Sequence, residues 1–317
     1  MTDNNRQRKG SLQFYPRVRA KKIVPRANWS SPVDLKTVST LGFLGYKAGM
    51  VSVLVKDNTE KSLTNGKRII VPATVIECPK MKIYSVRLFK DGKIVKDFIV
   101  SNDKKLNSKV KVNKEVSKVD FDNNSFDDIR VILYSMTWNV PAISQKKPNF
   151  TEMGIGGNID QKKDWVLKNL NTEISVKDVF SENTLLDTIA VTRGFGTMGP
   201  VKRFGIALKN HKSEKGVRRP GSLSSFGLRR VTFRAPQAGQ TGFHKRVAYN
   251  NVVIRVSDST KNVNPKSGFD NYGFVKNDYI ILRGSVPGPK KRVILLKKPI
   301  RPTKYQAKKN YEVMEIR

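Results

Sequence analysis

The sequence contains very little cysteine and histidine, with one cysteine, Cys78, and two histidines among 317 residues. A single cysteine excludes an intrachain disulfide and any zinc site built from several cysteines. Cys78 lies in the stretch VIECPK, so we predict that its side chain is a small buried one and not a reactive thiol.

Long apolar runs are absent as well. No run approaches the roughly 18 apolar residues that a membrane-spanning helix needs. The N-terminus is basic but lacks the apolar stretch of a signal peptide. We therefore expect a cytoplasmic protein with no membrane partner.

Acidic residues are scarce, with 26 against 61 basic residues and a net charge of +35. Residues 1–30, 193–246 and 283–309 hold 31 of the basic residues and only 2 of the acids, which leaves the remainder at about +6. This distribution predicts an ordinary globular body with three cationic segments that bind a polyanion. The length allows one large domain or two smaller ones, with a substantial core.

The central segment 193–246 is the most cationic of the three. It has thirteen Lys or Arg and one acid, Glu214, and glycines and prolines interrupt it too often for a long helix. Such a segment cannot enter an apolar core, because each buried cation would need a partner. Its counter-charge must come from outside the chain, and nucleic acid is the commonest polyanion.

The N-terminal segment 1–32 mixes cations with Phe14, Tyr15 and Trp29, and three prolines exclude a continuous helix. It predicts an extended arm whose guanidinium groups pair with phosphates while its rings stack on exposed bases. The alternative is a solvated tail, which would have no use for these aromatic residues.

From residue 41 onward, short β-branched or aromatic runs alternate with turn signals such as DN, NG and DG. This pattern predicts a mainly β fold with a closed or nearly closed antiparallel sheet. We predict one helix within 160–173 and strands in the following ranges: 41–56, 68–77, 82–89, 93–100, 129–138, 174–180, 185–192, 248–256, 278–284 and 292–298. The predicted organisation is an extended basic arm (1–40), a globular body (41–192 and 247–298) with a polar insertion at 101–127, a long basic loop (193–246) and a basic C-terminal tail (299–317).

Enzymatic alternatives find little support in these residues. Residues 194–199 match GxGxxG, but Lys202 and Arg203 stand where the apolar face of a dinucleotide-binding helix would begin. The one acid near His211 is Glu214, in the charged stretch HKSEKG, and no acid is close in sequence to His244, so base or phosphate contact is the better interpretation of both. No catalytic triad, paired carboxylates or P-loop is visible, and we predict neither enzymatic activity nor a small-molecule substrate.

Five stretches, taken together, resemble the large-subunit ribosomal protein L-three family in its archaeal and eukaryotic form. They are GSLQFYPRVRAKKIVPR (10–26), LGYKAGM with VPATVIECP (44–50 and 71–79), AVTRGFGTMGPVKRFGI (190–206), PQAGQTGFHKRVAYN (236–250) and YIILRGSVPGPKKRVILLKKPIR (279–301). They occur in the family's order and extend over nearly the whole chain.

The resemblance implies a six-stranded β-barrel of the kind shared with translation factors, a few short helices, a long basic central loop and basic N- and C-terminal arms. It also implies binding to large-subunit rRNA, a loop that approaches the peptidyl-transferase region, an early role in subunit assembly, and neighbouring ribosomal proteins as partners. No cofactor is expected, apart from structural Mg²⁺ or K⁺ ions that bridge to rRNA.

The predicted RNA-binding residues belong to the arm and to the central loop. They are Arg6, Arg8, Lys9, Arg17, Arg19, Lys21, Lys22, Arg193, Lys202, Arg203, His211, Arg218, Arg219, Phe226, Arg229, Arg230, Gln237, Gln240, His244, Lys245 and Arg246. Phe226 and His244 are the candidates for base stacking. Where the family usually has a Trp-x-Pro-Ala loop tip, this chain has Phe226, Gly227, Leu228 and Arg229, so a role tied to the indole does not carry over.

Two other functions remain as alternatives. A non-ribosomal RNA-binding or ribosome-maturation factor would share the charge pattern, and only its absence from mature large subunits would distinguish it. An enzyme built on the barrel would retain a flavin or nucleotide on purification.

Overall fold

The computed structural model describes residues 10–11, 13–29, 37–112, 117–121, 125–223, 230–258 and 263–317. Contacts divide the chain into two compact units. We call residues 1–22 and 191–245 the arm–loop unit, and residues 23–190 and 246–317 the body.

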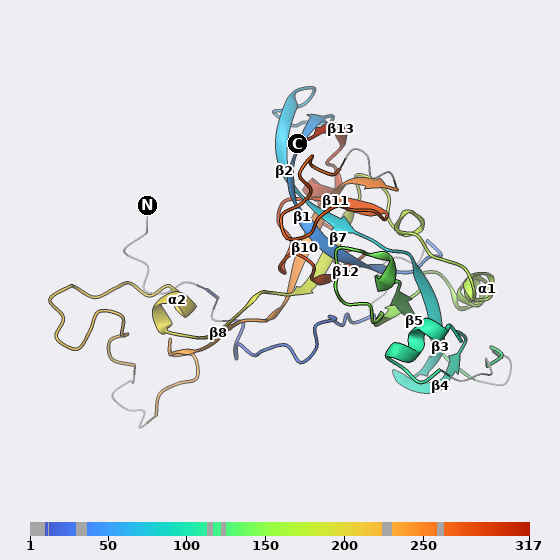
Figure 1. The fold of residues 1–317 in the computed structure, drawn as a ribbon, viewed down its shortest axis with the longest axis horizontal. Helices are drawn as coiled ribbons and strands as arrows, with labels where there is room; N and C mark the ends of the chain where they lie inside the picture. Colours follow the sequence, from blue (N-terminus) through green and yellow to red (C-terminus); the bar gives the residue numbers. More distant parts are fainter. Residues whose placement is uncertain are drawn as a thin grey trace. The chain divides into compact units, whose positions relative to one another are not determined.

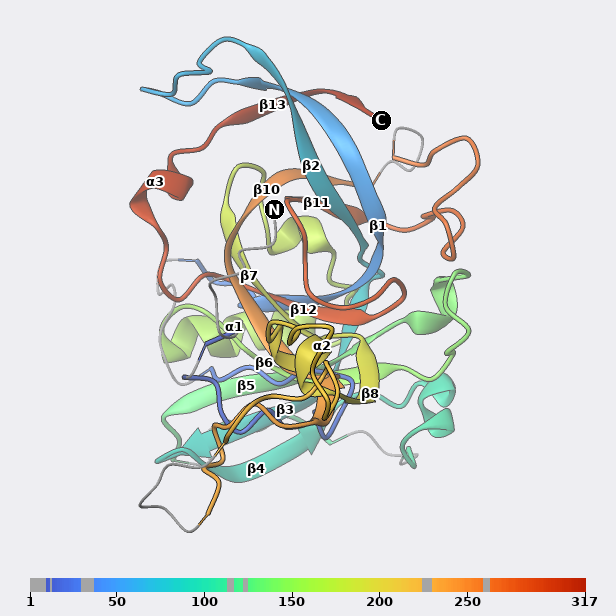
Figure 2. The same ribbon diagram turned by 90° about the vertical axis from the view of Figure 1, so that its left-hand side faces the viewer.

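The main sheet has the strand order β12-β7-β10-β11-β2-β1-β13 (Figures 1 and 2). Its strands are β1 (Gly42–Asp57), β2 (Arg68–Glu77), β7 (Leu185–Val191), β10 (Lys245–Ser257), β11 (Tyr279–Arg283), β12 (Val293–Lys297) and β13 (Tyr311–Ile316). β12 also pairs with β1, from Gly42 opposite Lys297 to Tyr46 opposite Val293. The pairing order therefore runs from β12 through five other strands and back to β12. The predicted mainly β class is confirmed.

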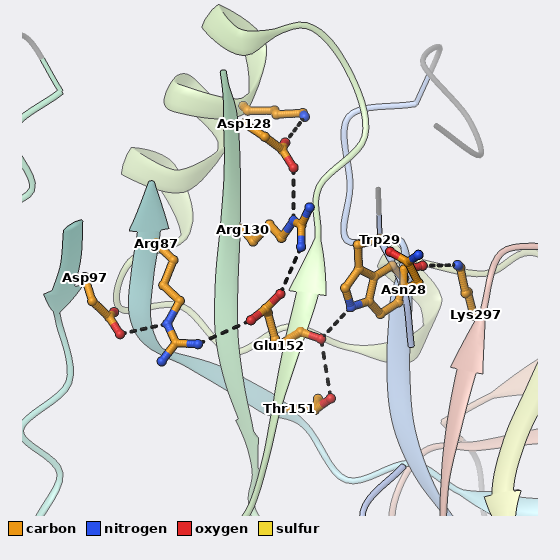
Figure 3. A network of polar contacts seen from close by, with 10 residues as sticks. Asn28, Trp29, Arg87, Asp97, Asp128, Arg130, Thr151, Glu152 and Lys297 are labelled. Atoms are coloured by element: carbon orange, nitrogen blue, oxygen red, sulfur yellow. Dashed lines mark hydrogen bonds and ion pairs between the residues drawn. The ribbon is translucent and has the colours of Figure 1, made fainter. Parts of the chain in front are cut away.

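A second sheet has the order β4-β3-β5-β6, with strands β3 (Met81–Lys90), β4 (Lys93–Ile99), β5 (Asp128–Ser135) and β6 (Asn149–Gly154). A chain of ion pairs crosses it and reaches helix α1 (Ile159–Asn169), with links of 2.7–3.2 Å (Figure 3). Its members alternate in charge: Lys162, Asp128, Arg130, Glu152, Arg87 and Asp97. These three cations are neutralised within the body, so they are not expected to bind a polyanion.

Apolar residues of the body form two buried clusters. One contains Phe43, Leu44 and residues of both sheets, and the other contains Val53, Val75 and Ile281. All residues of β7 and β12 are buried, including Asp187 and Thr188 of β7 and Lys297 of β12. The other residues of both strands are apolar, as burial on both faces predicts. Cys78 is fully buried as predicted, and burial first, then the charges of Asp278 and Glu77, raise the pKa of its thiol.

The prediction of a strand at 174–180 is wrong. Ile174 forms only an isolated bridge with Met81, and a 3₁₀ helix follows at Val176–Asp178. The Ser175 hydroxyl accepts a hydrogen bond from Lys177 N, and the Asp178 carboxylate accepts one from Ser175 N. These two caps stabilise a helical turn in a segment whose alternating apolar residues had suggested a strand.

Strands β6 and β13 were not predicted. β13 lies in the segment 299–317 that we predicted as a basic tail, and it follows the short helix α3 (Lys304–Ala307). β13 pairs with the C-terminal part of β1, residues 53–57, and Tyr311 is buried in the second apolar cluster. In the polar insertion 101–127, one short 3₁₀ helix forms at Lys104–Ser108. Another 3₁₀ helix, at Thr137–Asn139, lies outside the insertion and follows β5.

Trp29 was predicted to stack on bases, and the structure corrects this interpretation. Its side chain is 5% exposed, its indole N–H donates to the Glu152 carbonyl at 2.8 Å, and the Lys297 ammonium lies 4.8 Å from its ring (Figure 3). Trp29 is therefore a core residue of the body and is not available to a ligand.

Candidate nucleic-acid interface

A two-stranded hairpin organises the arm–loop unit. Strand β8 (Gly194–Met198) pairs with β9 (Gly239–Gly242), and the five-residue helix α2 (Pro200–Phe204) follows β8. Gly242 has φ +74°, and a Cβ there would lie 2.0 Å from the Arg193 carbonyl oxygen. Only glycine permits this close approach of the two strands.

The GxGxxG motif is thus placed in β8 and at the N-cap of a very short helix. A dinucleotide-binding fold needs a longer helix packed on a parallel sheet, so this geometry gives the motif no such role.

Three hydrogen bonds join the described part of the arm to helix α2 and to the two residues that follow β9. Ala20 N donates to the Phe243 carbonyl at 2.8 Å, and the Arg17 guanidinium donates to the Arg203 carbonyl at 2.8 Å. Nδ1 of His244 lies 2.7 Å from the Val18 carbonyl. These contacts join residues 186 to 226 positions apart in sequence, so the arm and the loop form one structure.

His244 does not have the surroundings of a base-stacking residue. Its ring is 8% exposed and is held by Val18, and its backbone N–H donates to the Thr192 hydroxyl at 3.1 Å. Little of this side chain is exposed to a base in this structure, and the predicted base contact of His244 stays a prediction. His211, by contrast, lies in an exposed turn.

Arg203 uses its donors inside the protein. Nε donates to the Gln240 carbonyl at 3.1 Å, and Nη1 donates to the Gln237 carbonyl at 3.0 Å. Burial, with the nearby charge of Arg17, lowers the pKa of Arg203. Arg17 and Arg203 thus connect the arm, α2 and β9. Their predicted phosphate contacts stay a prediction.

Aromatic rings alternate with these guanidinium groups. The parallel rings of Tyr15 and Phe204 have centroids 6.3 Å apart, and the Arg17 guanidinium lies 4.3 Å from the Phe204 ring. Phe233 meets Tyr15 edge-on at 6.4 Å. We call the six side chains the cation–aromatic ladder: Arg203, Phe204, Arg17, Tyr15, Phe233 and Arg234.

The other predicted cations in the described residues are exposed. They are Arg19, Lys21, Lys22, Arg193, Lys202, Arg218, Arg219, Arg230, Lys245 and, in the body, Arg246. Gln237 is exposed, and Gln240 is partly buried with its amide directed to the carbonyls of Thr241 and Gly242. Arg6, Arg8, Lys9, Phe226 and Arg229 lie outside the described residues.

Glu214 is the one acid among the described residues of the arm–loop unit. The unit therefore cannot neutralise its own cations, and its field favours an anionic ligand with many charges. Sequence reasoning missed the exposed rings Phe195 and Phe233, although each lies within two residues of an arginine, a pairing that can mark RNA-stacking sites.

Among the described residues, no helix is long and apolar enough to cross a bilayer. A sequence model of the family described as ribosomal protein L3 matches residues 1–101 and 90–316. The chain belongs to the ribosomal protein L3 family.

Relatives named large ribosomal subunit protein uL3 match almost end to end. The protein of Archaeoglobus fulgidus is 40% identical over 312 residues, with 95% of this chain and 93% of the relative covered. The Methanococcoides burtonii protein is 37% identical over 317 residues (95% and 94%), and the Methanobrevibacter smithii protein is 35% identical over 319 residues (95% and 94%). Membership in this family confirms the resemblance inferred from the five sequence stretches.

Proposed function

We propose that this protein is a structural component of the large ribosomal subunit that binds and orders large-subunit rRNA through its arm–loop unit. The observation that carries the proposal is the segregation of charge. The predicted cations of the unit are largely exposed, whereas the described residues there include a single acid. rRNA phosphates supply the counter-charge that the chain lacks.

The same proposal includes finer features. The six strands β12, β7, β10, β11, β2 and β1 form a β-barrel of the type shared with translation factors. The central loop approaches the peptidyl-transferase region. The protein joins the subunit early in assembly, contacts neighbouring ribosomal proteins and works in the cytoplasm. Its role is to bind and order rRNA, without catalysis. Its functional divisions are the arm (1–40), the globular body (41–192 and 247–298), the central loop (193–246) and the C-terminal tail (299–317).

A charge-neutralising comparison tests the RNA interface. Arg218, Arg219 and Arg230 are replaced together by Gln, and the control replaces Lys93, Lys146 and Lys147, which are exposed on the body. Each set removes the same charge. Affinity for large-subunit rRNA is measured at several salt concentrations. The slope of log K against log salt is negative, and its magnitude should decrease by about 2–3 for the loop variant only. Equal slopes for both variants would show that the loop does not contact phosphates.

A sucrose-gradient profile of cell extract in high salt tests the place in the ribosome. We expect the protein to remain with the large subunit, as an integral component threaded into rRNA does. Release into the light fractions would instead indicate a maturation factor held by charge alone.

A further inference from the structure

The last aromatic ring of the cation–aromatic ladder, Phe233, is exposed. Phe233 is 70% exposed, although it meets Tyr15 edge-on at 6.4 Å and the Arg234 guanidinium lies 5.3 Å from its centroid. With so much of the side chain in solvent, a face of the ring is open to a planar ligand.

The inner members of the ladder hold this ring in place. Tyr15 is stacked on Phe204, which is buried, and the Arg17 guanidinium lies within 5.5 Å of both rings and donates to the Arg203 carbonyl. Phe233 is therefore the end of a supported stack and not an isolated side chain on a loop. A supported ring loses little conformational entropy when a ligand stacks on it.

The charge around the ring determines which ligand fits. The Arg17 and Arg234 guanidinium groups lie close to the aromatic rings, and Arg230 is exposed nearby in the chain. An apolar protein surface placed over Phe233 would bring no anionic group to a region whose described residues include Glu214 as the one acid. A single-stranded nucleotide supplies both a π face for the ring and a phosphate for the cations.

We propose that Phe233 is a stacking platform for one unpaired nucleobase of the bound RNA, with Arg234 next to the phosphate of the same nucleotide. This inference rests on the proposed function. It assigns base stacking to a residue other than Phe226 and His244, which the sequence had favoured.

The test compares full-length variants in binding to large-subunit rRNA from the same cells, with excess unrelated RNA to suppress non-specific binding. Phe233→Leu keeps an apolar side chain but removes the π face, and it should weaken binding about tenfold, since stacking contributes roughly 1–3 kcal/mol per base. Its salt slope should not change, because no charge is removed. Phe233→Tyr retains the ring and should bind within about twofold of the wild type.

Leu208→Ala is the matched control, because Leu208 is another exposed apolar residue of the same loop and has no ring. It should bind like the wild type. Zero-length ultraviolet crosslinking of the wild-type complex should also attach a nucleotide to the peptide that contains Phe233.

Wild-type affinity in Phe233→Leu, or an equal loss in Phe233→Tyr, would overturn the inference and leave rRNA binding intact. Unchanged rRNA affinity with loss of a neighbouring protein from the subunit would overturn it in favour of a protein contact. A wild-type protein that fails to bind the rRNA would overturn both this inference and the proposed function.

Discussion

Arg17 and Arg19 stand two positions apart in the arm, and the sequence predicts the same phosphate contact for both. The structure gives them different surroundings. Arg17 is partly buried against the rings of Phe204 and Tyr15 and donates to the Arg203 carbonyl, whereas Arg19 is exposed. The charge of Arg17 is thus used inside the protein, and that of Arg19 is available to RNA.

Substituting each arginine by alanine should separate the two roles. Arg17→Ala removes a cation–π contact of about 0.5–2 kcal/mol and a hydrogen bond, so trypsin should cleave the loop of the free protein several-fold faster. Arg19→Ala should leave this cleavage rate unchanged but lower the salt slope of rRNA binding by about 1. The reverse pattern would show that Arg17 is the phosphate contact.

At the scale of elements, the turn between β1 and β2 is fixed by one carboxylate. Asp57 is buried and accepts hydrogen bonds from Thr59 N at 3.0 Å, Ser62 Oγ at 2.9 Å and Thr64 Oγ1 at 2.5 Å. Burial acts to raise the pKa of Asp57, but these donors together outweigh burial and hold the pKa well below its usual value. The charged form is the one that the turn stabilises.

Asp57→Asn should therefore lower the free energy of unfolding by about 1–3 kcal/mol at pH 7. Because the folded pKa is depressed, the carboxylate contributes fully above the unfolded pKa, near about 4, and the contribution is lost as pH falls toward the folded pKa. Urea unfolding should show a constant difference between variant and wild type above that pH and a shrinking one below it. Glu60→Gln, an exposed control in the same turn, should have no such effect.

The C-terminal strand gives a second element-scale prediction. A chain that ends after Asn310 loses β13, including the buried Tyr311, and exposes the outer edge of β1. Its free energy of unfolding should fall by about 3 kcal/mol or more, as for other buried aromatic residues. Met314→Ala, at an exposed position of the same strand, should change stability by less than about 0.5 kcal/mol. An undiminished stability of the truncated chain would mean that the segment behaves as a tail.

At the scale of the whole molecule, charge separates the two units. The body neutralises several of its own cations, as in the chain of ion pairs through Arg87 and Arg130, whereas the described arm–loop unit has Glu214 alone as an acid. The arm–loop unit should therefore dominate the electrostatic part of RNA affinity.

The wild-type protein should accordingly show a steep salt dependence. If it neutralises about 6–10 phosphates, its affinity for large-subunit rRNA should fall roughly 10³–10⁵-fold between about 50 and 200 mM salt. Filter binding across that range measures the slope. A nearly flat dependence would contradict phosphate contact as the main source of affinity.

Much of the fold could be predicted from local patterns. The bounds of β2, β3, β11 and β12 were predicted almost to the residue. Buried positions of a strand are mostly apolar, so continuous or alternating burial gives an apolar pattern that is visible in the sequence. The segment 174–180 was misjudged because its caps compete with an apolar alternation, and β13 was missed because its residues resemble those of a charged tail. The functional divisions predicted from charge stay a prediction.

The sequence by itself determined the mainly β class, the buried state of Cys78, the family and the three cationic segments. Each of these depends on composition, periodicity or the order of motifs, which are local properties of the chain. Tertiary structure alone decided which of the described cations and rings are exposed and which are buried. Trp29 and His244 are buried and contact the Glu152 and Val18 carbonyls, and the Arg17 guanidinium lies over the Phe204 ring. Each of these contacts joins residues more than a hundred positions apart. No local pattern records such contacts, because they depend on how the chain folds back on itself.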